Sequence, residues 1–265
     1  MSQDFPIALR AAAPYINAHR GRVCVVQIPG EVSASSALTA LVHDLAVAHS
    51  LGLKLILVLG ARPQIDARLA ERGLSTPMVG GQRVTDPQVL DCVKEAAGHL
   101  RSEYEALLST GLASTPMGGA RIRVASGNLV TARPLGVREG VDLQFTGELR
   151  RLDTETLRDH LDRSRIVLLT PLGTSPTGET FNLLSEDLAL ATARAMDADK
   201  LVLLSAEPVA RGEFSLTHPP ANPGPAERLA LAAVQAGVPR IHILSADDDG
   251  AFLRELYTRD GGGMM

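Results

Sequence analysis

Short runs of consecutive apolar residues alternate along the chain with longer segments in which apolar residues recur every three or four positions. The short runs are typical of β-strands covered on both faces, and the longer segments predict helices. The predicted strands are 23–26, 55–59, 166–169, 200–204 and 241–244, and the predicted helices are 5–19, 33–50, 63–72, 86–108, 186–196, 225–236 and 251–257. This alternation predicts an α/β fold with a mainly parallel open sheet sandwiched by helices.

The period changes near the middle of the chain. Residues 121–124 and 129–132 alternate polar and apolar side chains, and Ser126-Gly127-Asn128 lies between them. Two alternating segments joined by such residues predict a β-hairpin, so we expect an inserted β-rich region there. The loop 207–224, with its four prolines, is a candidate for a mobile connection.

Three polar loops next to predicted strands are candidate ligand sites. At Gly60-Ala61-Arg62 a strand turns into a helix whose N–H groups suit an anion, although many α/β proteins have such a turn without a ligand. Arg83 precedes a helix and has a planar donor fork that fits a carboxylate, or it is a surface arginine. Residues 173–182 follow a strand at the edge where open sheets bind ligands, or they form a solvated turn.

Composition and charge exclude several classes of function. The 265 residues are 45% hydrophobic and contain no Trp, so one large aliphatic core can form. The net charge of −4 and the lack of a basic stripe argue against nucleic acid. No secretion signal or membrane-spanning run occurs, so we expect a cytoplasmic protein without a membrane partner. Cys24 and Cys92 lack the spacing of a metal site, so we expect buried free thiols and no metal.

In their order along the chain, the motifs resemble the amino-acid kinase family, and within it the amino-terminal, acetylglutamate-kinase-like domain of bacterial N-acetylglutamate synthases. The matching segments are Pro14–Asn17, His19–Gly21, Gly60–Ala67, Arg83–Asp86, Ser126–Asn128, Pro134–Val137, Gly178–Leu183, Arg254–Leu256 and Arg259–Gly261. The match extends over nearly the whole chain, from residue 5 to residue 263.

The resemblance implies a regulatory and oligomerising domain without a cofactor. Residues 1–20 would form a helix that interlaces with that of a neighbouring subunit and builds a hexameric ring, and residues 21–265 would form the kinase-like domain. The domain would bind L-arginine, the end product of the biosynthetic pathway. A separate acetyltransferase domain, in cis or in trans, would transfer acetyl from acetyl-CoA to L-glutamate, and no such domain is expected in this chain.

The arginine site implied by the resemblance consists of Tyr15, Glu255 and Gly261. Glu255 would bind the guanidinium, Tyr15 would close the pocket, and the turn at Gly261 would bring the backbone close to the ligand. The family's usual Gly-Ile-Gly-Thr is replaced here by residues 261–264, Gly-Gly-Gly-Met, which lose an apolar anchor and a hydroxyl. From spacing alone, Glu255 would instead be a solvated helix residue.

The alternative activity, acetylglutamate kinase, requires cations that this sequence lacks. The family's kinases place a lysine at the end of the first strand, where this chain has Gln27, and a glycine where it has Pro29. The aspartate that orients the lysines is replaced by Glu186. The three lysines of the chain, none of them at a catalytic position of the kinases, are Lys54, Lys94 and Lys200. Since phosphoryl transfer depends on positive charge around the phosphoryl oxygens, we expect no kinase catalysis.

A remnant of the kinase pocket would remain at Gly60, Arg62, Arg83 and Asn182 and would bind N-acetylglutamate weakly. A third possibility is a purely structural relative that forms oligomers and binds no small molecule.

Overall fold

A six-stranded, entirely parallel sheet forms the centre of the computed structural model, which describes residues 4–259 except 112, 114, 116 and 210–223. The strand order is β14-β13-β1-β2-β10-β5. The strands are β1 (Val23–Ile28), β2 (Lys54–Leu59), β5 (Arg123–Ala125), β10 (Arg165–Leu169), β13 (Lys200–Ser205) and β14 (Ile241–Ser245). The predicted parallel sheet is confirmed, with strand boundaries shifted by one or two residues.

Helices cover both faces of this sheet. Along β1, Cys24 and Val26 belong to one buried cluster and Val25 to the other, as expected for alternating side chains between two covering layers. The first face is covered by α1 (Asp4–His19), α2 (Gly30–Ser33), α3 (Leu38–Ser50), α4 (Arg62–Glu71), α5 (Pro87–Leu108) and α9 (Ala251–Tyr257). The second face is covered by α6 (Thr154–Asp162), α7 (Ser185–Ala195) and α8 (Pro225–Gln235). The helix observed in place of the predicted helix 33–50 is shorter than predicted, because α3 starts only at Leu38.

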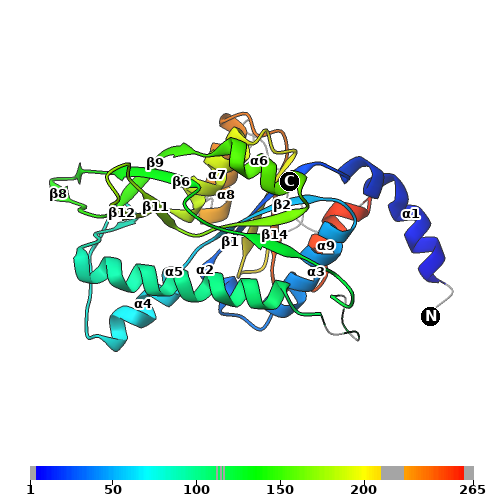
Figure 1. The fold of residues 1–265 in the computed structure, drawn as a ribbon, viewed down its shortest axis with the longest axis horizontal. Helices are drawn as coiled ribbons and strands as arrows, with labels where there is room; N and C mark the ends of the chain where they lie inside the picture. Colours follow the sequence, from blue (N-terminus) through cyan, green and yellow to red (C-terminus); the bar gives the residue numbers. More distant parts are fainter. Residues whose placement is uncertain (1–3, 112, 114, 116, 210–223, 260–265) are drawn as a thin grey trace.

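A second, four-stranded sheet has the order β12-β11-β6-β9. Its strands are β6 (Val130–Pro134), β9 (Gly147–Leu152), β11 (Leu172–Thr174) and β12 (Thr180–Asn182), and two small hairpins join β3 (Met78–Val79) to β4 (Gln82–Arg83) and β7 (Val137–Arg138) to β8 (Val141–Asp142). Figure 1 shows these strands toward the end of the molecule opposite α1, with α5 extending along the same end.

The predicted hairpin over 121–132 is wrong. β5 pairs in parallel with β10 in the central sheet, whereas β6 pairs with β9 and β11 in the second sheet. The turn residues at 126–128 mark the place where the chain passes from one sheet to the other. Alternation fits both segments because each strand is only partly covered, and a turn signal does not specify the pairing partner.

Two further expectations concern the loop 207–224 and the thiols. Most of the loop lies outside the described residues. Cys24 and Cys92 are both free and buried, and burial raises the pKa of the Cys24 thiol to about 12. Within the part of the chain that the structure describes, no helix is both long and apolar enough to cross a bilayer.

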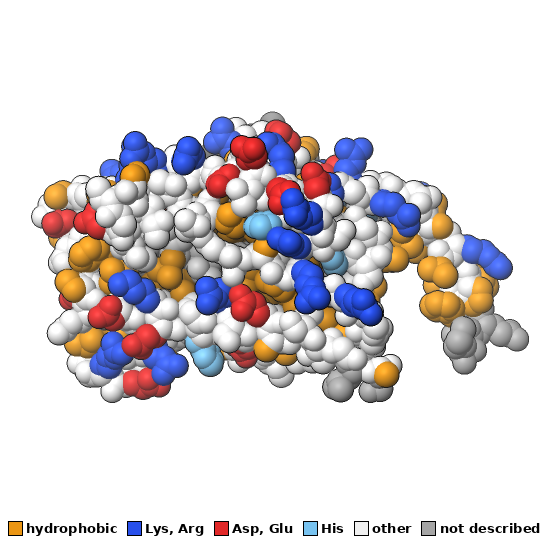
Figure 2. All heavy atoms as spheres, viewed as in Figure 1, with side chains coloured by type: hydrophobic (Ala, Val, Ile, Leu, Met, Phe, Trp, Pro, Cys, Tyr) orange, Lys and Arg blue, Asp and Glu red, His pale blue; other side chains and the backbone are white. Residues whose placement is uncertain are grey.

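Helix α1 is only partly packed against the rest of the chain. Ala12, Tyr15 and Ile16 contact the buried cluster of the first sheet face, and α1 lies against α9. Near the amino end, Phe5 and Leu9 are about half exposed, at 52% and 50% of their surface. Figures 1 and 2 show this end of α1 projecting from the body of the molecule with apolar side chains on its surface.

Helix α9 is held at its amino end by Asp44 of α3. The Asp44 carboxylate accepts a hydrogen bond from the backbone N–H of Leu253, in the first turn of α9, where N–H groups have no partner within the helix. Burial, reinforced by the nearby negative charge of Asp249, nevertheless raises the pKa of Asp44 to about 6. The contact therefore positions α9 but carries an electrostatic cost when Asp44 is ionised.

We predict that Asp44→Asn stabilises the chain above pH 6. The folded-state pKa lies above the unfolded value, so the ionised form destabilises the fold at high pH, and this cost disappears as the pH falls below about 4. The asparagine oxygen can still accept the bond from Leu253. Denaturant unfolding should show a gain of about 1 kcal/mol at pH 8, after allowance for partial solvent screening, and little gain at pH 4.

The matched control for this measurement is Asp247→Asn, because Asp247 is exposed in the loop before α9. Its free energy of unfolding should change little at either pH. A gain for Asp44→Asn that is equal at pH 4 and pH 8 would show that the charge is not the cause.

Candidate functional site

A pocket opens at the carboxyl ends of β1, β2 and β10, where parallel sheets place their ligands. The open space at this site, which includes solvent at its mouth, is about 600 Å³. The four residues expected in a remnant kinase pocket, Gly60, Arg62, Arg83 and Asn182, all line it. The close approach at Gly60 favours glycine, because a Cβ there would lie a tight 3.1 Å from both the backbone N of Gly30 and Ser185 Oγ.

Gln27, near the carboxyl end of β1, is not among the residues that line the pocket, but it contacts one of them, Ser185, and is neutral. The Gln27 side chain is only 4% exposed, and its Nε2 donates to Ser185 Oγ over 3.5 Å. Ser185 Oγ in turn donates to Glu186 Oε2 over 2.8 Å. A neutral amide therefore ends a short hydrogen-bond chain that leads to a carboxylate.

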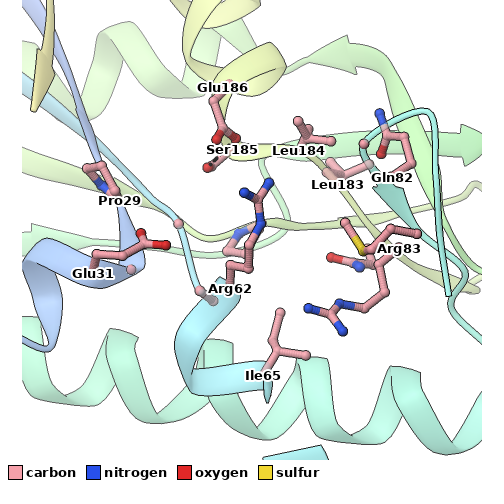
Figure 3. A pocket seen from close by; sticks show the side chains of 17 residues that line it. Pro29, Glu31, Arg62, Ile65, Gln82, Arg83, Leu183, Leu184, Ser185 and Glu186 are labelled. Carbon is pink, nitrogen blue, oxygen red and sulfur yellow. Dashed lines mark hydrogen bonds between the residues drawn. The ribbon is translucent and has the colours of Figure 1, made fainter. Parts of the chain in front are cut away.

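Arg83 and Asn182 are held at the opposite wall of the pocket. Arg83 Nη2 lies 2.5 Å from Asp66 Oδ1, and its side chain is 10% exposed. Asn182 Nδ2 donates to Thr85 Oγ1 over 3.1 Å, and Thr146 Oγ1 donates to the same hydroxyl over 2.9 Å. Figure 3 shows Arg62 and Arg83 on different sides of the open space.

A second cluster lies at the opposite, amino-terminal edge of the sheet and centres on Glu255. The Glu255 side chain is 9% exposed, and its Oε1 lies 2.7 Å from His242 Nδ1. On the other side of the imidazole, His242 Nε2 lies 3.2 Å from Lys200 Nζ. The three residues come from α9, β14 and β13. The interpretation of Glu255 as a solvated helix residue is therefore wrong, because tertiary packing of α9 on the sheet buries it.

The donors in this cluster determine the tautomer of His242. A lysine ammonium has only donors, so His242 Nε2 accepts from Lys200 and the ring proton resides on Nδ1, facing Glu255. Nδ1 is buried but forms no hydrogen bond of good geometry to any described residue, so its contact with Glu255 is electrostatic. Burial lowers the pKa of Lys200, and the charge of Glu255 opposes that shift.

Helix α1 reaches this cluster through His19. The His19 ring packs edge-on against Tyr257 of α9 with centroids 6.1 Å apart, and its Nδ1 lies 4.0 Å from Asp199 Oδ2. Burial and the charge of Lys200 lower the pKa of His19. Tyr15 is half-buried one turn earlier on α1 and contacts the same buried cluster as Tyr257.

The structure thus places Tyr15 and Glu255 on two helices that contact each other, whereas Gly261 lies outside the described residues. Sequence reasoning missed Lys200, His242 and His19. The available signal was a lysine and a histidine within the apolar runs 200–204 and 241–244, where polar side chains require partners.

Comparisons with known proteins identify the family of the chain. The sequence profile described as "Amino acid kinase family" matches residues 22–208, which is more than half of the chain. The chain belongs to the amino acid kinase family. This confirms the family expected from the motifs. A carbamate kinase from Giardia lamblia bound to AMP-PNP shares the fold with a TM-score of 0.62, at 14% identity over 92% of this chain and 98% of that one.

Closer relatives of this amino acid kinase family member are acetyltransferases. The amino-acid acetyltransferase of Pseudomonas fluorescens strain Pf-5 is 50% identical over 272 residues, covering 97% of this chain and 63% of that protein. The crystal structure of N-acetylglutamate synthase from Neisseria gonorrhoeae complexed with coenzyme A and L-arginine has a TM-score of 0.87 and 35% identity, covering 98% of this chain and 64% of that one. The chain therefore spans slightly less than two thirds of the length of these relatives.

We predict strong energetic coupling between Lys200 and Glu255. Replacing either charge alone leaves the other buried without its partner, so the double variant should recover part of the loss. A double-mutant cycle with Lys200→Met and Glu255→Gln should give a coupling energy of about 2 kcal/mol in denaturant unfolding.

The exposed ion pair of Lys54 and Asp162 is the matched control. Their side chains are 32% and 67% exposed and 2.7 Å apart, so the cycle with Lys54→Met and Asp162→Asn should give less than about 1 kcal/mol. Coupling at Lys200 and Glu255 no larger than at this surface pair would contradict the interpretation of the cluster as one electrostatic unit.

Proposed function

We propose that the chain is the arginine-sensing, oligomerising domain of an N-acetylglutamate synthase and that it lacks kinase catalysis. The observation that carries the proposal is the buried Glu255 carboxylate, held beside His242 and Lys200 where α9 meets α1. The similarity to an N-acetylglutamate synthase whose structure contains L-arginine supports the same conclusion.

The cluster has the groups that a free arginine requires. A guanidinium binds best to a carboxylate, which Glu255 supplies, and the ligand's own carboxylate requires a cation, which Lys200 supplies. His242 lies between these two charges and separates them. Arginine would replace the imidazole as the partner of Glu255, and Tyr15 and the turn at Gly261 would close over the ligand.

Arginine binding would act on assembly through α1. The carboxyl-terminal part of α1 reaches the cluster through His19, and its amino-terminal part exposes Phe5, Ile7 and Leu9. An apolar helix end that the described part of its own chain leaves exposed suits the equivalent helix of a second copy, as in the hexamer that we propose. The domain would carry out its regulatory role together with an acetyltransferase domain, in cis or in trans, that converts acetyl-CoA and L-glutamate into N-acetyl-L-glutamate.

The pocket at the carboxyl ends of the strands would retain the ability to bind a carboxylate through Arg83 and Asn182, N-acetylglutamate included. Phosphoryl transfer there is disfavoured, because the buried Gln27 supplies no charge to the phosphoryl oxygens.

We predict that Glu255→Ala and Glu255→Gln both weaken L-arginine binding by about 10- to 100-fold. A charge-assisted, partly buried pair contributes about 1.5–3 kcal/mol, and the glutamine variant keeps the shape of the side chain while it removes the charge. Calorimetric titration with L-arginine measures the effect, and Glu155→Gln, an exposed change on α6, serves as the control. Unchanged affinity in both Glu255 variants would place the arginine site elsewhere.

We also predict no ATP-dependent phosphorylation of N-acetyl-L-glutamate. Without a lysine at position 27, the developing negative charge of the transition state lacks its main partner. ADP release should equal that of a control without protein over several hours. Steady turnover that is lost in Arg62→Ala would establish the kinase alternative.

The exposed end of α1 should control the oligomeric state. We expect Phe5→Ser/Leu9→Ser to lower the mass measured by light scattering, because both side chains lie on the part of α1 that projects from the body. Val137→Ser/Val141→Ser removes two exposed apolar side chains from the β7–β8 hairpin and should leave the mass unchanged. Equal masses for all three proteins would exclude α1 as the assembly element.

A further inference from the structure

The pocket at the carboxyl ends of the strands carries charges of both signs. Glu31 of α2, Arg62 of α4, Arg83 of β4 and Glu186 of α7 all line it. Figure 3 shows Glu31 and Glu186 on two sides of the space into which Arg62 extends, with Arg83 at the far wall. The four side chains come from four different elements, so the fold itself gathers them.

Three of these charges form no ion pair with any residue that the structure describes. Among the residues that the structure describes, none of opposite charge pairs with Glu31, Arg62 or Glu186, although all three line the same pocket. Glu186 accepts a hydrogen bond from the Ser185 hydroxyl, and Arg83 is bound by Asp66. Unpaired charges of opposite sign, held apart around a pocket, fit a ligand that itself carries both signs.

The same arrangement opposes a ligand that carries only negative charge. The carboxylates of Glu31 and Glu186 line the pocket, and the buried Gln27 behind Ser185 is neutral. A phosphate, or a fully anionic carboxylate ligand, would approach Glu31 and Glu186 with Arg62 as the one cation of the described lining that is not bound to a carboxylate.

We infer that this pocket binds a free α-amino acid as its zwitterion. Glu31 and Glu186 hold the α-ammonium, Arg62 holds the α-carboxylate, and Arg83 with Asn182 holds a second carboxylate in the side chain of the ligand. A dicarboxylic amino acid such as L-glutamate therefore fits the complete set of charges. N-acylation, which removes the ammonium, removes the group that these two carboxylates select.

The inference goes beyond the proposed arginine site, because Glu255, His242 and Lys200 lie at the opposite edge of the sheet and contribute nothing to this pocket. It also changes the class of ligand expected from the kinase resemblance, from an acylated glutamate to an unacylated one.

The matched pair of probes is L-glutamate and N-acetyl-L-glutamate, which share both carboxylates and differ in the ammonium. Calorimetric titration of the full chain at pH 7.5 should show L-glutamate bound at least tenfold more tightly. Glu186→Gln and Glu31→Gln should each weaken L-glutamate binding about tenfold and should leave N-acetyl-L-glutamate unchanged or slightly tighter. Arg83→Ala should weaken both ligands, and the control Glu155→Gln should weaken neither.

N-acetyl-L-glutamate bound as tightly as L-glutamate, or no saturable binding of L-glutamate at millimolar concentration, would overturn the inference. So would unchanged L-glutamate affinity in both Glu31→Gln and Glu186→Gln. Titration with L-arginine separates the two proposals. Arginine binding that depends on Glu255 but not on Glu186 supports the proposed function whatever L-glutamate does, whereas arginine binding that depends on Glu186 alone refutes the proposed arginine site.

Discussion

The burial of Lys200 beside His242 and Glu255 is the constraint on which the arrangement of the first and last elements depends. A buried ammonium is stable only with a partner, and here that partner is supplied through an imidazole from the neighbouring strand and the last helix. The cluster therefore fixes α9 on the sheet, and α9 in turn gives α1 its only extended contact surface within the described chain. Asp44 adds a second contact that fixes α9, because its carboxylate holds the amino end of that helix.

The two ends of the parallel strands have separate chemistry. One edge carries the Lys200 cluster, at the beginning of β13 and β14, and the other carries the pocket beyond β1 and β2. A strand of five or six residues separates edges by about 20 Å, which is too far for direct contact between ligands. Any influence of one site on the other must pass through the packed strands and through helices such as α7, which contacts both β1 and β13.

The central sheet could be predicted well from the sequence, because its strands are apolar on both faces. A continuous apolar run is a strong local signal for a buried strand. The hairpin prediction failed because Ser126-Gly127-Asn128 indicates a turn without indicating which strands pair after it. The remnant pocket residues came from the resemblance, and the fold brings all of them together. Lys200 and His242 were missed because they lie 42 positions apart and meet only through the pairing of β13 with β14. Contacts of that kind depend on topology, which local patterns do not contain.

The two buried thiols have a consequence for how the fold can be followed in time. Cys24 lies in the centre of the sheet with a strongly raised pKa, so in the folded chain it is neither accessible to a thiol reagent nor ionised enough to react with one. Modification must wait for an opening of the sheet, and its rate then reports how often that opening occurs. The rate at which Cys24 is modified therefore measures how often the folded chain opens at β1, the strand from which the rest of the sheet extends on both sides.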